Sequence, residues 1–196
     1  MPYSWRIGAL VGLALTLVLY DRIMGRDWVE RAWTYGLLLV SGGLGAAYGA
    51  THNAITCAIS PYYFIWGKGL DAGGAHQAMI LGGQAGFAAG AIACAIWQYA
   101  LRRSPVRARA LLIARFCWLP AGLAIVLASF FPVVFTGLDP LGLGVELAEG
   151  PVPESAMLQV LAVWWIHAGT YSGAVIGLVA GIALARRAQS KQCTPT

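Results

Sequence analysis

The sequence has few charged residues. Only 11% of its 196 residues are Asp, Glu, Lys or Arg, and 59% are hydrophobic. Soluble domains carry about 25% charged residues, and a soluble fold of this length could not keep so much apolar surface out of water. The composition therefore excludes an ordinary soluble domain and predicts an integral membrane protein, with the lipid bilayer as its first partner.

Several short motifs that carry known chemistry are also missing. The sequence has no Walker phosphate loop, no HExxH zinc motif and no GxSxG nucleophile motif. Its four cysteines form no CxxC pair, which argues against a zinc or thioredoxin-like site. The apolar runs hold no carboxylate except Asp21 at a margin. Because proton- and sodium-coupled transporters usually rely on buried carboxylates, this absence argues against that class.

Five apolar segments are long enough to cross a membrane, which takes about 20 helical residues. They are residues 5–24, 33–50, 77–101, 111–135 and 156–185. The expected fold is therefore all-α: one transmembrane domain over residues 1–196, a bundle of about five helices. The longest connections, 51–76 and 136–155, lie on the same side of the membrane in this arrangement.

The basic residues predict the orientation of the bundle. The net charge is +5, and the bases lie in short segments between apolar runs, which is a topology signal and not a nucleic-acid signal. Segment 102–115 holds only basic charges, whereas segment 136–155 holds only acidic ones. The positive-inside rule then places segment 102–115 and the C-terminus in the cytoplasm. We expect a multi-pass protein of a bacterial inner membrane, with loops 51–76 and 136–155 outside.

Glycine is abundant, with 25 residues, and recurs at every fourth position in several apolar segments. This spacing puts the glycines on one helical face, where the lack of side chains lets two backbones approach closely. It predicts small-xxx-small packing, or a glycine zipper, within the chain, or a face for another subunit, a second copy or a pore. The glycines in the third and fifth segments are Gly82, Gly86, Gly90, Gly169, Gly173, Gly177 and Gly181. The fourth segment instead carries Pro120, which predicts a kink.

His167 is the most informative polar residue. It lies about 16 Å into the fifth segment at helical rise, where a titratable group usually faces the bundle interior. Its ring has a donor and an acceptor that both need partners. Gln84 lies at a similar depth in the third segment, so we expect a polar cluster of His167, Gln84, Tyr171 and Thr170, with Gln84 bonded to His167. The alternatives are a structural histidine, a proton relay, a substrate contact and a haem or metal ligand.

The outer connection 51–76 holds further candidates. His52 and His76 should lie near the same membrane interface, and Asp71 could join them as a carboxylate ligand for a first-row metal. No HxxxH or HxxE spacing supports that site, so no metal is assigned. Tyr63 belongs to an aromatic cluster, 62–66, which predicts either an anchor in the headgroup region or a lid over an outward-facing cavity.

Residues 51–64 resemble a segment of uncharacterised bacterial multi-span proteins. Their pattern reads approximately His-Asp-Gln-Ile-Thr and then Ile-Ser-Pro-Glu-Tyr-Phe, just after the first of four spans. The residues that match are His52, Ile55, Thr56, Ile59, Ser60, Pro61, Tyr63 and Phe64. Tyr62 stands where those proteins have glutamate. The resemblance implies a four-span core after one extra span, and it brings no established activity.

Three functions remain as expectations. The first is a non-enzymatic accessory or assembly subunit of a membrane complex, which binds through helix faces and outer loops. The second is a small-solute channel or carrier lined by His167 and Gln84. The third is a membrane enzyme with a histidine-ligated haem or metal, although the sequence indicates no cofactor firmly.

Overall fold

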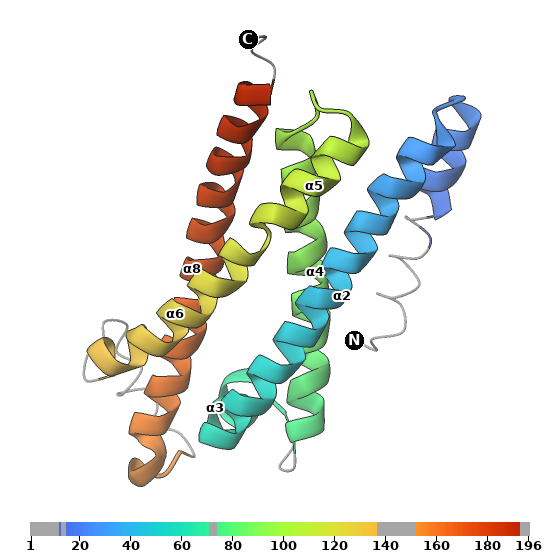
Figure 1. Ribbon diagram of the computed structural model, residues 1–196. Helices are drawn as coiled ribbons and strands as arrows, with labels where there is room; N and C mark the ends of the chain where they lie inside the picture. The colour runs from blue at the N-terminus through green and yellow to red at the C-terminus, as the bar shows by residue number, and fades with distance from the viewer. Residues whose placement is uncertain (1–11, 13–14, 71–73, 137–151, 193–196) are drawn as a thin grey trace.

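The computed structural model describes residues 12, 15–70, 74–136 and 152–192. Every regular element in this part of the chain is a helix (Figure 1). The helices are α2 (Trp28–Ile59), α3 (Pro61–Lys68), α4 (Ala75–Ala100), α5 (Val106–Phe116), α6 (Trp118–Phe135) and α8 (Glu154–Gln192). Residues 15–23 before α2 are also helical. The first part of the first expected span, Asp71 and most of the connection 136–155 lie outside the described residues.

Local sequence signals explain where the first helices begin and end. The Asp27 carboxylate caps α2 by accepting a hydrogen bond from the Val29 amide at 2.9 Å. Ser60 interrupts the helix, and Pro61 then occupies the first turn of α3, where its missing N–H costs nothing. Gly69 ends α3 with a left-handed φ of 63°, and the Leu70 amide donates to the Phe64 carbonyl at 3.1 Å.

The connection expected at 51–76 is therefore mostly helical. The structure continues α2 to Ile59, nine residues past the expected end, and folds α3 back onto the bundle, where Tyr63 and Phe64 are buried. Hydropathy alone predicts a connection here because polar residues such as Thr51 and Asn53 lower the hydropathy of this stretch. In the structure Asn53 faces inward, so the helix can continue without exposing its amide.

The helices form two closely packed pairs, α2 with α4 and α6 with α8 (Figure 1). In the first pair, glycine meets glycine. A Cβ built on Gly45 would lie 2.2 Å from the Gly86 carbonyl oxygen, and one built on Gly49 would lie 2.1 Å from that of Gly82. The two backbones touch directly, so only glycine fits at these four positions.

In the second pair the glycines belong to one helix. A Cβ on Gly169, Gly173 or Gly177 of α8 would lie within 2.5 Å of a carbonyl oxygen of α6. The facing positions on α6 are leucines, whose backbone carbonyls make the contact. Those leucines are Leu127, Leu123 and Leu119, in the same order.

Two apolar clusters join the pairs at opposite ends. One contains residues from α2, α3, α4 and α8, among them Phe64, Ala78 and Val163. The other contains residues from α4, α5 and α8, among them Trp97 and Ala185. At this second end the Arg109 guanidinium also donates to the Glu30 carboxylate at 2.8 Å, which ties α5 to the start of α2.

The fourth apolar segment is interrupted, as its proline suggested, although not at the proline itself. Helix α5 ends at Phe116 and α6 begins at Trp118, with Cys117 between them. Pro120 is therefore the third residue of α6, inside the first turn, where no intrahelical donor is needed. The break precedes Pro120 because its ring cannot pack against a continuous preceding turn.

Three helices in the described chain are long and apolar enough to cross a membrane. They are residues Ala75–Ala100, Val106–Phe135, which includes the break at Cys117, and Glu154–Ser190. Helix α2 has 32 residues, about 48 Å at helical rise, so it has the length but a more polar composition. The polar half of α2 contributes the site described next.

Candidate functional site

His167 lies inside the bundle on α8, with only 6% of its surface exposed. The ring atom Nδ1 lies 2.9 Å from the Val163 carbonyl oxygen, one turn earlier in the same helix. A carbonyl only accepts, so Nδ1 carries a proton and donates to it. In a neutral ring, Nε2 is then left as an acceptor that needs a donor.

The polar group that faces His167 is Asn53 of α2. His167 Nε2 lies 3.4 Å from Asn53 Oδ1, while Asn53 Nδ2 donates to the Ala78 carbonyl at 2.9 Å. The bond to Ala78 fixes the amide with its oxygen toward His167. When the ring is neutral with Nδ1 protonated, two acceptors therefore face each other: His167 Nε2 and Asn53 Oδ1. A neutral ring has one N–H, so His167 can donate to the Val163 carbonyl or to Asn53 Oδ1 but not to both.

Three aromatic rings enclose His167. The Tyr63 ring stacks on it with centroids 4.9 Å apart, and the His52 ring meets it edge-on at 4.7 Å. Phe64, which is almost fully buried, closes a third side at 6.1 Å. The site thus combines α2, α3 and α8 at the place where the two helix pairs meet.

Two more polar atoms in this region are buried without a hydrogen-bond partner among the described residues: His52 Nε2 and Ser60 Oγ, which lies at the start of α3. Buried polar atoms in folded proteins nearly always have a partner, and leaving one unpaired costs about 1–3 kcal/mol. Together with His167 Nε2, they give the cluster unmet hydrogen-bonding capacity. Such capacity is typical of a site that receives a small polar molecule.

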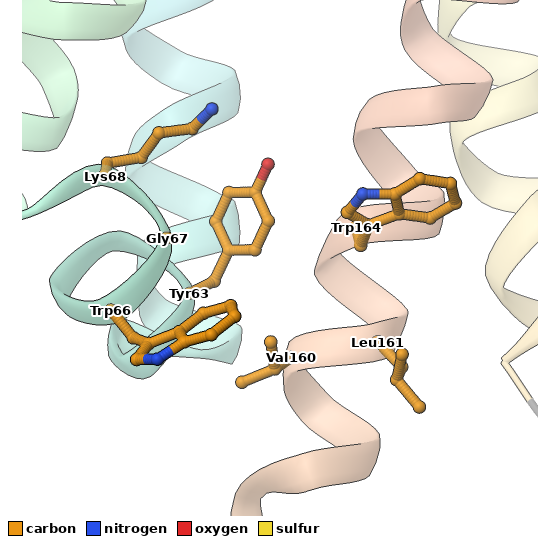
Figure 2. Close-up of a pocket in the computed structure, with 7 residues that line it drawn as sticks. All are labelled: Tyr63, Trp66, Gly67, Lys68, Val160, Leu161 and Trp164. Carbon is orange, nitrogen blue, oxygen red and sulfur yellow. The ribbon is translucent and has the colours of Figure 1, made fainter. Parts of the chain in front are cut away.

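A cavity of about 200 Å³ opens beside the cluster, between α3 and α8. Figure 2 shows its walls: Trp66 and Tyr63 from α3 on one side, and Val160, Leu161 and Trp164 from α8 on the other. The Lys68 ammonium extends toward it, 5.7 Å from the Tyr63 ring centroid. Burial raises the pKa of the Tyr63 phenol to about 12, so this group stays a neutral hydrogen-bond donor at physiological pH.

The structure brings only some of the predicted site residues together. His167, His52 and Tyr63 form one cluster, and Thr170 is buried one turn from His167, where its hydroxyl donates to the Ile166 carbonyl at 2.9 Å. Tyr171 lies at the edge, 64% exposed, with its ring 6.2 Å from that of His167.

Two predicted partners lie elsewhere. Gln84 is exposed on α4, and it has no contact with His167 among the described residues, so the expected bond between them is wrong. The depth estimate ignored rotation: Gly82, two residues earlier, faces α2, which turns Gln84 away from the helix contact. His76 is exposed at the start of α4, apart from the His52 cluster, and the described residues contain no group of three His, Cys, Asp or Glu side chains placed to hold a metal.

Sequence reasoning missed Asn53 and Lys68. The hydropathy pattern predicts a connection from residue 51, so Asn53 falls outside the expected helices; the general rule that a polar residue in a membrane helix faces the bundle interior applies only once α2 is known to continue. Lys68 is the only basic residue between Arg31 and Arg102. Its isolation from the other bases could have marked it as a candidate ligand contact.

Comparison with family models, curated proteins and solved structures found no match to this chain.

Proposed function

We propose that the protein is a five-span bundle of the bacterial inner membrane, with its C-terminus in the cytoplasm. The three long apolar helices support insertion, and the arginines support the orientation. The starts of α2 and α5 are joined by the pair Glu30–Arg109, and the ends of α4 and α8 are joined by the bond from Arg186 to the Ala100 carbonyl. The basic residues of four segments therefore lie at one end of the bundle (Figure 1).

Labelling of single cysteines in intact cells tests this placement. We expect Gly67→Cys, at the α3 end, to react with a membrane-impermeant maleimide, and Arg107→Cys, at the arginine end, to react only after lysis. Both positions are exposed, and a side chain on Gly67 meets no atom within 4 Å. Labelling of Arg107→Cys in intact cells would contradict the orientation.

Within the membrane, we propose that the protein acts as a non-enzymatic subunit that assembles with another membrane helix through α4. Gln84 carries this proposal. It lies about 14 Å from the start of α4 at helical rise, exposed, with no hydrogen bond in the described chain. An amide facing hydrocarbon has no water to bond, whereas a partner helix can supply a donor and an acceptor.

The size of the complex in mild detergent tests the assembly. We expect the wild-type protein to migrate in native gels above the mass of one chain, and Gln84→Leu to shift toward the monomer. Gln77→Leu is the matched control, because Gln77 is exposed on the same helix but lies near its end, where water can reach it. A wild-type protein that is monomeric in every mild detergent, or equal effects of the two changes, would overturn the proposal.

The cavity beside Tyr63 favours a second candidate, a carrier for a small aromatic or apolar anion. Trp66 and Trp164 supply flat apolar walls, and Lys68 supplies the positive charge. Benzoate is a suitable probe in proteoliposomes. We expect Lys68→Ala to reduce benzoate uptake about tenfold, because it removes the free energy of one charge-assisted hydrogen bond. Arg107→Ala should leave the uptake unchanged. No uptake above that of empty liposomes would exclude this candidate.

A further inference from the structure

The arginine end of the bundle contains a second hollow, which the proposed function does not use. It has a volume of about 350 Å³ and lies between the end of α4 and the last turns of α8. Its walls are Ala100, Arg102 and Arg103 on one side and Arg186 and Gln189 on the other. We call it the arginine groove. Its two sides are held together by Gln189, whose amide donates to the Ser104 hydroxyl at 2.7 Å.

The groove has three positive charges and, within the described part of the chain, no counter-charge. The ion pairs of the described chain use other bases: Arg26 and Arg31 pair with Asp21, and Arg109 pairs with Glu30. No carboxylate of the described residues lines the groove. Three guanidinium groups from two segments thus converge on one hollow without an acid, which is the arrangement that binds an anion.

Two of the guanidinium groups are already positioned. Arg102 lies over the Tyr99 ring at 4.2 Å and donates to the Tyr99 carbonyl at 3.3 Å. Arg186 donates through Nε to the Ala100 carbonyl at 3.4 Å, which leaves its terminal nitrogens available for a ligand. Positioned guanidinium groups lose less entropy when they bind, and their planar donors match the oxygens of a phosphate.

The surface below the groove is apolar. Tyr99 is 68% exposed, and Ile96, which lies one turn earlier on the same face of α4, is also exposed. A free anion would use only the arginines, whereas a lipid would use the arginines for its headgroup and these side chains for its acyl chains. A basic pocket between helices on the cytoplasmic side is a known setting for anionic lipids.

We propose that the arginine groove binds the phosphate of an anionic phospholipid from the cytoplasmic leaflet. The phosphate oxygens accept hydrogen bonds from Arg103 and Arg186, and the acyl chains lie along the exposed face of α4 that carries Tyr99 and Ile96. This proposal rests on the membrane placement proposed above, but it is independent of the contact through Gln84.

The test uses purified, delipidated protein in a neutral detergent, with phosphatidylglycerol as the probe. Native mass spectrometry counts the retained lipids, and the thermal unfolding temperature reports binding to the folded state. We expect one retained phosphatidylglycerol and a raised unfolding temperature. Phosphatidylcholine and inorganic phosphate at the same concentration should give neither, because the first has no net charge and the second has no chains.

Two double variants remove the same charge from different places. Arg103→Gln with Arg186→Gln should weaken phosphatidylglycerol binding by at least about tenfold, as expected for lost charge-assisted bonds. Arg107→Gln with Arg187→Gln, which removes two exposed arginines outside the groove, should change it by less than about twofold, as expected for screened charges at a distance. All four substitutions are at exposed positions, so both variants should fold, and a normal gel-filtration profile will verify this.

Three results would overturn the proposal. Equal weakening in the two double variants would show diffuse attraction and no defined groove. Equal retention of phosphatidylcholine would show that the headgroup charge is not recognised. Equal stabilisation by inorganic phosphate would assign the groove to a free anion. If the cysteines label as proposed but no phosphatidylglycerol is retained, the groove proposal fails while the membrane placement stands.

Discussion

The two helix pairs solve the same packing problem in different ways. Between α2 and α4, glycines on both helices let the two backbones touch, as at Gly45 and Gly86. Between α6 and α8, only α8 supplies glycines to the contact, and α6 presents the backbone carbonyls of leucines. The first contact is therefore constrained on both helices. The second is constrained on one helix only, so α6 should tolerate changes that α2, α4 and α8 do not.

The largest effect is expected in the pair constrained on both sides. Gly45→Leu places its Cβ 2.2 Å from the Gly86 carbonyl oxygen, a backbone atom that cannot rotate away. We expect the destabilisation to exceed about 3 kcal/mol, the upper end of ordinary overpacking, so that no folded protein is recovered. Recovery of a monodisperse peak in gel filtration after detergent extraction measures this.

Gly43→Leu is the control for this change. It lies two residues away on the same helix, is exposed, and a side chain there meets no atom within 4 Å. We expect wild-type recovery. If Gly43→Leu and Gly45→Leu behave alike, the close approach of α2 and α4 is not what holds this pair together.

The second pair should show the asymmetry directly. Gly173→Leu on α8 brings a Cβ within 2.2 Å of the Leu123 carbonyl oxygen, and we expect loss of the folded protein. Gly122→Ala on α6 brings a Cβ only to within 3.6 Å of Trp118 in its own helix, so we expect a slight stabilisation of up to about 1 kcal/mol from the better helix former. Recovery of a monodisperse peak in gel filtration measures the loss for Gly173→Leu, and thermal unfolding measures the change for Gly122→Ala.

Ala174→Leu provides the local control on α8. Ala174 is next to Gly173 but only partly buried, so its added bulk has room to extend outward, and a milder loss is expected. A Gly122→Ala variant that unfolds as readily as Gly173→Leu would remove the distinction between the two pairs.

The glycine spacing could be predicted from sequence because it depends only on helical periodicity. The glycines at every fourth position in 82–90 and 169–177 all face a neighbouring helix in the structure. The periodicity that predicts this face can be read from each helix separately. Which helix each glycine faces could not be predicted, since that depends on how the helices pair. The partner of α8 is α6, a proline-containing helix with one glycine, which no stripe in the sequence identified.

The site around His167 also shows that a sequence predicts the depth of a residue better than its partner on another helix. Burial of His167 followed from its depth in an apolar helix, and the structure does bury it. The choice of Gln84 as its partner matched depth alone, whereas a hydrogen bond also requires the right face and the right neighbour. Asn53 satisfies both because α2 continues past residue 50 and lies beside α8 there.

Tyr63, at the junction of the two pairs, should make stability depend on alkaline pH. Burial raises the pKa of its phenol from the ordinary value of 10.0 to about 12. Between these values the unfolded chain loses the phenolic proton while the folded protein keeps it, so stability falls as pH rises from 10 to 12 and is unaffected below that range. The full loss is on the order of 2–3 kcal/mol at pH 12, from about 1.4 kcal/mol per unit.

Tyr63→Phe should remove this contribution, because phenylalanine has no proton to lose. Unfolding temperatures of the two proteins at pH 9.5 and pH 11 give the comparison. We expect the wild-type protein to lose more stability over this interval than the variant. Parallel losses in the two proteins would mean that the Tyr63 hydroxyl is not shielded at the junction.

The smallest effect is expected at the other junction, where Arg109 of α5 meets Glu30 of α2 at 2.8 Å. The two side chains differ in environment: the arginine is 10% exposed and the glutamate 52% exposed. Water screens the exposed partner, so the pair should contribute no more than about 0.5–1 kcal/mol. Glu30→Gln keeps the shape of the side chain and one acceptor oxygen for the guanidinium, and we expect a loss of stability within this range in thermal unfolding.

Arg109→Gln should reduce the stability more than Glu30→Gln does, since it also removes a buried aliphatic stem and leaves the Glu30 charge unpaired. If Glu30→Gln instead destabilised the protein as much as Gly45→Leu, the ion pair and not the glycine contacts would hold the two halves of the bundle in place.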